Sequence, residues 1–126
     1  EWGYVGKFDQ PQDIETLSQR CADICEHDVF AVLSGPKKIT TIGVVSGSGS
    51  PTATDIPELI AKGVQLYITG DPRESTPNLM KESNINYFAC GHYATEVFGV
   101  QALGEKIKLE FKNNLEVEFI DIPNSI

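Results

Sequence analysis

A histidine and a glutamate stand four residues apart, at His92 and Glu96, directly after Gly91 in the stretch ACGHYATEVFG. On a helix this spacing puts both side chains on one face with Cβ atoms about 5–6 Å apart, so an imidazole nitrogen and a carboxylate oxygen can meet one metal ion. Nitrogen and oxygen donors favour zinc, iron or manganese. Taken alone, the pattern is also typical of a surface pair that supports the first turn of a helix.

Two ligands are fewer than the three or four that hold a metal ion tightly. The other histidine, His27, falls at the end of an expected helix, where a role at the helix terminus is the favoured interpretation. The thiols of Cys21, Cys25 and Cys90 are expected to be reduced and buried, because the first two continue an apolar helical stripe and the third ends an apolar strand. The sequence contains no pattern that predicts covalent catalysis by a serine or cysteine.

Helices and strands must position these residues, and sequence patterns typical of helices alternate along the chain with patterns typical of strands. Asp13 is the expected N-cap of the first helix. The expected strands cover 29–34, 38–47, 64–71, 85–90 and 116–122, and the expected helices cover 13–27, 55–62, 75–84 and a long segment from about 92 to 111. The runs 29–34 and 38–47 predict two strands joined by a tight turn. The alternation predicts a single α/β domain over residues 1–126, with a largely parallel or mixed sheet flanked by helices.

Three polar loops follow expected strands: SGSGS at 46–50, TGD at 69–71 and CGHYATE at 90–96. Ligands of open α/β sheets lie beyond the carboxyl ends of the strands. We therefore expect the functional site where these three loops meet.

Each loop also carries candidates beside the His92–Glu96 pair. Gly47, Ser48 and Gly49 could present backbone N–H groups to a phosphate, although the loop lacks the third glycine of a dinucleotide fingerprint and a purely structural turn is the alternative. Asp71 could orient a ligand or face a substrate, or simply stabilise a turn. Thr95 could donate a hydrogen bond near the ligands, with helix packing as its alternative.

Composition narrows the range of functions. The formal net charge of −8 leaves no basic surface for a phosphate backbone, so we expect no nucleic-acid partner. No stretch approaches the roughly 20 apolar residues of a membrane helix, and the N-terminal residues do not have the pattern of a signal peptide. A cytoplasmic protein without membrane contact is the expectation.

The motifs GYVGKF, SGSGS, ITGD, GHYATE and VEFIDIPN together resemble the Nif-three-like family, the GTP cyclohydrolase I type 2 homologues. The resemblance covers essentially the whole chain and is to the C-terminal half of a longer family member. It implies a Nif-three-like fold in which His92 and Glu96 match two ligands of a centre of two divalent metal ions, zinc, iron or manganese. In the family, a histidine pair and an aspartate of the N-terminal half complete that centre. The resemblance also implies a homo-oligomer, since family members form ring-shaped hexamers.

Two metal ions about 3.5–4 Å apart suit the hydrolysis of a small anionic or cyclic substrate. The first interpretation is therefore a metal-binding, hydrolase-like protein whose catalytic residues are not assigned by the sequence. The alternative is a non-enzymatic assembly or interaction module with an incomplete metal site. A third hypothesis is nucleotide binding by Gly47–Gly49.

Overall fold

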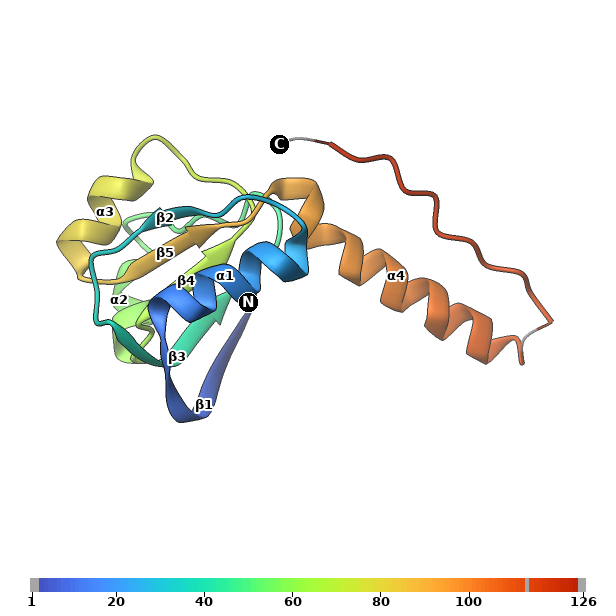
Figure 1. Cartoon of the computed structure of the whole chain (residues 1–126), viewed down its shortest axis with the longest axis horizontal. Coiled ribbons are helices and arrows are strands. Elements are labelled where there is room, and N and C mark those ends of the chain that lie inside the picture. The colour runs from blue at the N-terminus through green and yellow to red at the C-terminus, as the bar shows by residue number, and fades with distance from the viewer. Residues whose placement is uncertain (1–2, 113, 125–126) are drawn as a thin grey trace.

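Five strands form one mixed sheet in the order β1-β3-β4-β5-β2 in the computed structural model, which describes residues 3–112 and 114–124 (Figure 1). The strands are β1 (Tyr4–Asp13), β2 (Phe30–Val32), β3 (Lys38–Val44), β4 (Leu66–Thr69) and β5 (Asn86–Ala89). The helices are α1 (Ile14–Cys25), α2 (Ile56–Ala61), α3 (Thr76–Ser83) and α4 (His92–Glu110). β3, β4 and β5 are parallel, whereas the outer strands β1 and β2 are antiparallel to their neighbours. The predicted mixed sheet flanked by helices is confirmed.

Alternate side chains of the central strands serve two separate cores. On β5, Phe88 joins α1 on one face of the sheet, while its neighbour Tyr87 joins α2 and α3 on the other. On β4, Leu66 and Tyr67 divide in the same way. This period of two is the ordinary pleat of a strand, and it leaves the carboxyl ends of β3, β4 and β5 open between the two helical layers.

The predicted tight turn between residues 29–34 and 38–47 is wrong. β2 pairs with β5 at one edge of the sheet, whereas β3 lies between β1 and β4 near the opposite edge. The connecting loop is held at β5 by Asn86, whose side chain accepts a hydrogen bond from Gly35 N at 2.9 Å and donates one to Pro36 O at 2.8 Å. These long-range bonds fix the loop that crosses the sheet from β2 to β3. β3 pairs with β1, a strand that the sequence patterns did not predict.

The predicted strand 116–122 is also wrong, because the described residues after α4 have no strand partner. The segment is extended and runs back along α4 (Figure 1), where Val117 lies beside Gly104 and the Tyr93 hydroxyl donates to the Asp121 carboxylate. α4 itself projects away from the sheet, and none of its residues is buried. Within the described part of the chain, no helix has the length and apolar character needed to cross a membrane.

Candidate metal centre

The three loops predicted to form a site do meet at the carboxyl edge of the sheet. The carbonyl oxygen of Gly47, after β3, accepts hydrogen bonds from the backbone N–H groups of Gly70 and Asp71, after β4, each at 3.0 Å. The N–H of Gly91, after β5, donates to Gly70 O at 3.1 Å. Backbone bonds therefore fix the three loops relative to one another before any side chain is considered.

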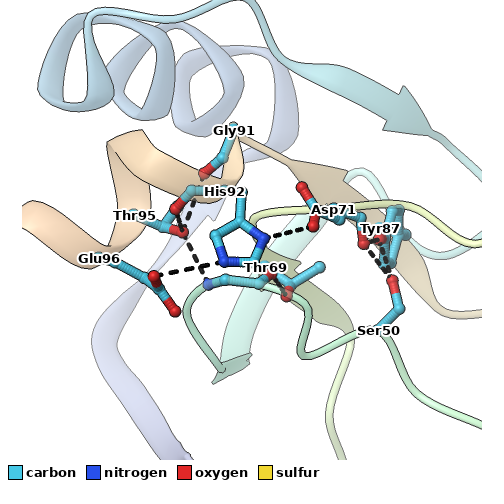
Figure 2. A network of polar contacts seen from close by, with 9 residues as sticks. Ser50, Thr69, Asp71, Tyr87, Gly91, His92, Thr95 and Glu96 are labelled. Atoms are coloured by element: carbon cyan, nitrogen blue, oxygen red, sulfur yellow. Dashed lines mark hydrogen bonds and ion pairs between the residues drawn. The ribbon is translucent and has the colours of Figure 1, made fainter. Parts of the chain in front are cut away.

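His92 is the first residue of α4, and its two ring nitrogens face two different carboxylates (Figure 2). Nδ1 lies 2.5 Å from Oδ2 of Asp71, and Nε2 lies 3.3 Å from Oε2 of Glu96. Gly91 has a φ of 91°, a conformation that favours glycine, and it turns the chain from β5 into α4. The structure thus brings Asp71, His92 and Glu96 together, and it places Asp71 where it can orient the imidazole.

The two carboxylates perturb the titration of this histidine. The hydrogen bond that His92 donates to Asp71 is the largest cause that raises the pKa of His92, and the charges of Asp71 and Glu96 act in the same direction, while desolvation opposes them. With Nδ1–H donating to Asp71, a neutral His92 presents the Nε2 lone pair toward Glu96. Histidines that bind metals are commonly oriented in this way, by a carboxylate on the nitrogen that does not bind.

Gly47 leaves the space that the Glu96 carboxylate occupies. A Cβ atom on Gly47 would lie 2.2 Å from Oε1 of Glu96 and 3.3 Å from Nε2 of His92, and the residue has a φ of 60°. Real Cβ atoms do not approach other atoms so closely, so a side chain at position 47 would displace the glutamate. The glycine of the SGSGS loop therefore makes room for the His92–Glu96 pair.

The other candidates of the sequence occupy different positions. The Thr95 hydroxyl accepts a hydrogen bond from Gly47 N at 2.9 Å and donates to Gly91 O at 2.9 Å, so it joins the loops rather than facing the His92–Glu96 pair. Ser48 is exposed. Gly49 packs against Val45, and its carbonyl accepts a hydrogen bond from Tyr67.

Ser50 and Tyr87 belong to this network but were not among the candidates from the sequence. The Tyr87 hydroxyl donates to the carbonyl of Asp71 at 2.9 Å and lies 2.6 Å from Oγ of Ser50, which also donates to that carbonyl. Burial is the main cause that raises the pKa of Tyr87 to about 12, so it remains a donor at neutral pH. In the sequence, Ser50 is the last residue of the SGSGS loop, and Tyr87 is a hydroxyl-bearing aromatic residue in an otherwise apolar strand, which does not by itself identify a site.

The donor set fits a divalent ion, but only as part of a coordination shell. The Nε2 atom of His92 and the carboxylate of Glu96 lie 3.3 Å apart, and the absence of a Cβ atom on Gly47 makes room for that carboxylate. In the described ranges 3–112 and 114–124, no group of three or more histidine, cysteine, aspartate or glutamate side chains is arranged to hold a metal ion. A metal site built on His92 and Glu96 would therefore need further donors.

The fold and the site define an α/β domain that presents a histidine–carboxylate pair at the carboxyl edge of a mixed sheet. Residues 1–125 match the family model Duf34/NIF3 (NGG1p interacting factor 3). The chain belongs to the DUF34/NIF3 family, as its sequence motifs predicted.

Curated relatives and solved structures agree with this assignment. A GTP cyclohydrolase 1 type 2 homolog from Yersinia pestis is 37% identical over 120 residues, which are 94% of this chain and 47% of the relative. One from Archaeoglobus fulgidus is 39% identical over 73% of this chain and 36% of the relative. The structure of protein ybgI matches with a TM-score of 0.83 and 28% identity over 97% of this chain and 48% of that protein. The structure of TTHA1606 from Thermus thermophilus matches with a TM-score of 0.78 and 28% identity, over 96% of this chain and 47% of that protein.

The chain spans about half the length of the curated relatives it matches.

Proposed function

We propose that this chain contributes His92 and Glu96 to a dinuclear metal centre of a hydrolase-like protein. The other ligands of this centre would come from residues that are not part of this 126-residue sequence. The observation that carries the proposal is the orientation of His92, with Nδ1 held by Asp71 at 2.5 Å and Nε2 directed toward Glu96 at 3.3 Å. A surface pair that only supported a helix turn would not need a second carboxylate on the far ring nitrogen or a glycine that clears space for the glutamate.

Each residue of the site has a distinct part in this proposal. Asp71 keeps the proton of neutral His92 on Nδ1 and so leaves Nε2 free to bind. Glu96 adds a negative charge and a carboxylate that is able to contact one ion or two. A divalent ion would supply Lewis-acid polarisation of a phosphoryl or carbonyl group, which favours a small anionic substrate. Gly47 and Thr95 set the position of the loop beside the pair.

Titration with Mn²⁺ tests the proposal, because manganese prefers oxygen and nitrogen donors and binds thiolates poorly. Loss of the electron paramagnetic resonance signal of free Mn²⁺ measures binding directly. We expect His92→Ala and Glu96→Gln each to weaken binding by at least about tenfold. Glu105→Gln, an exposed glutamate of the same helix, is the matched control and should bind like the parent chain. Equal binding by all four proteins would overturn the proposed ligands.

A second candidate function is assembly without catalysis, and α4 favours it. The helix has no buried residue, and it exposes large apolar side chains that a lone domain would normally cover. These are Phe98, Val100, Leu103, Ile107 and Leu109. We propose that copies of this chain associate through α4. Sedimentation equilibrium should give a mass above 13.8 kDa for the parent chain and a lower mass for Leu103→Lys, with Leu33→Lys as a control at an exposed leucine outside α4. A monomeric parent chain would exclude self-association.

A further inference from the structure

Three thiols meet between α1 and β5, on the face of the sheet that α1 covers. Cys21 and Cys25 lie one helical turn apart on α1, and both pack against the buried cluster that contains Cys90, the residue that follows β5. Cys90 is fully buried, whereas Cys21 and Cys25 are half-buried, and all three are free thiols. The proposed metal pair uses none of them.

We propose that Cys25 and Cys90 form a redox modification site, in which a hydroperoxide oxidises Cys25 and Cys90 then closes an intramolecular disulfide. The three thiols are the only cysteines of the chain, so an intramolecular disulfide can form only among them. The disulfide would join the end of α1 to the residue that precedes Gly91.

Cys25 is the thiol best suited to attack the oxidant. The hydrogen bond from the Cys90 thiol is the largest cause that lowers the pKa of Cys25 to about 7, and the nearby His27 imidazole acts in the same direction, while desolvation opposes both. A substantial fraction of Cys25 is therefore thiolate at neutral pH, and the thiolate is the nucleophilic form. Half-burial leaves it reachable by a small oxidant.

Geometry makes Cys90 the second partner rather than Cys21. Residues four apart on a helix have Cβ atoms about 5–6 Å apart, whereas a disulfide requires about 3.5–4.5 Å. A bond between Cys21 and Cys25 would therefore distort α1. Cys90 approaches α1 from the sheet, and Cys25 packs against the buried cluster to which Cys90 belongs.

The two steps balance with hydrogen peroxide as the oxidant. The Cys25 thiolate attacks one peroxide oxygen, the O–O bond breaks, and the departing hydroxide takes up the proton that Cys25 had released, giving a sulfenic acid and water. The Cys90 sulfur then attacks the Cys25 sulfur, the S–O bond breaks, and the hydroxyl leaves as a second water with the proton of Cys90. The thiols lose two electrons in total, and the peroxide gains them.

The surroundings of Cys25 favour a neutral oxidant over an anionic disulfide such as oxidised glutathione. Asp23, Glu26 and Asp28 flank Cys25 in the sequence, all three are exposed, and the whole chain has a net charge of −8. Hydrogen peroxide carries no charge and is not repelled by this surface.

To test the proposal, the full chain is reduced under anaerobic conditions and treated with hydrogen peroxide at neutral pH. Its free thiols are then counted, and its peptides are mapped by mass spectrometry. We expect the free thiols to fall from three to one per chain, with Cys25 and Cys90 in a cross-linked peptide and no change in molecular mass of the chain beyond the loss of two hydrogens. Cys21→Ser should still form the disulfide, and Cys25→Ser should not. Oxidised glutathione should react more slowly than peroxide.

Cys90→Ala separates the two steps. In this variant Cys25 should stop at the sulfenic acid, which dimedone traps, and circular dichroism shows whether the variant folds. If Cys90→Ala does not fold, dimedone added together with peroxide to the parent chain should label Cys25 ahead of Cys21. Three thiols unchanged by peroxide, a disulfide that needs Cys21 instead of Cys25, or only intermolecular disulfides would each overturn the proposal.

Discussion

The Nδ1 atom of His92, at the start of α4, lies 2.5 Å from Oδ2 of Asp71, in the loop after β4. The contact joins two of the three loops at the carboxyl edge of the sheet, and it directs the other ring nitrogen toward Glu96. Since the hydroxyls of Ser50 and Tyr87 hold the backbone of Asp71, the orientation of the imidazole also depends on the loop after β3 and on β5.

Replacing Asp71 by asparagine should weaken metal binding while the fold remains. The amide keeps the shape of the side chain but loses the charge that orients His92 and favours its binding tautomer. Loss of such an outer partner typically costs about 10–100-fold in metal affinity. Mn²⁺ titration measures the change, and Asp9→Asn, at an exposed position of β1, is the control that should bind normally. Parent-like affinity in Asp71→Asn would show that the contact does not support a ligand.

The same contact gives the metal-free chain a pH-dependent stability. The pKa of His92 is raised above its ordinary value of 6.5, mainly by the hydrogen bond to Asp71. A raised pKa in the folded state means that the stabilisation is fully present below the unfolded pKa and is lost as pH rises through the folded pKa. The difference in free energy of unfolding between the parent chain and Asp71→Asn, measured in urea with a chelator, should therefore shrink as pH rises. A difference that is constant from acid to alkaline pH would contradict this linkage.

Local sequence patterns predicted the elements between residues 55 and 111 closely, because each strand and helix there carries its own periodicity and end signals. Gly63, with a φ of 69°, follows the C-cap of α2 and is such an end signal. They did not predict β1, which contains Pro11 and polar residues and becomes a strand by pairing with β3. Local patterns also could not show that β2 and β3 lie apart in the sheet. The loop between these strands is held by hydrogen bonds to Asn86, which lies some 50 residues later in the chain.

The candidate site divides in the same way. The spacing of His92 and Glu96 is a local property of one helix, so the sequence identified the pair and the loops that accompany it. The contribution of Tyr87 depends on a contact with Asp71, 16 residues earlier in the chain. The space that Gly47 leaves for Glu96 is likewise a relation between two elements, and a glycine-rich loop by itself predicts only a turn.

The hydroxyl of Thr95 should contribute to stability through one specific bond. Thr95→Val keeps the shape of the side chain but leaves the N–H of Gly47, a buried residue, without its acceptor. An unsatisfied buried donor costs about 1–3 kcal/mol, so the free energy of unfolding should fall by that amount. Thr95→Ser retains the hydroxyl and is the matched control. Chemical denaturation that gives the same stability for Val and Ser at this position would mean that the bond to Gly47 N does not contribute.

The space beside the His92–Glu96 pair can be tested separately from backbone strain, because Gly47 and Gly63 share a backbone conformation but differ in their surroundings. Gly47 and Gly63 have φ values of 60° and 69°, so alanine at either position pays the strain of a left-handed residue, roughly 1–2 kcal/mol. A Cβ at Gly63 meets nothing within 4 Å, whereas one at Gly47 would lie 2.2 Å from the Glu96 carboxylate. Both variants should therefore lose stability in urea, and only Gly47→Ala should lose Mn²⁺ binding as well. Equal metal binding by the two alanine variants would show that the position of Glu96 beside Gly47 is not needed for the site.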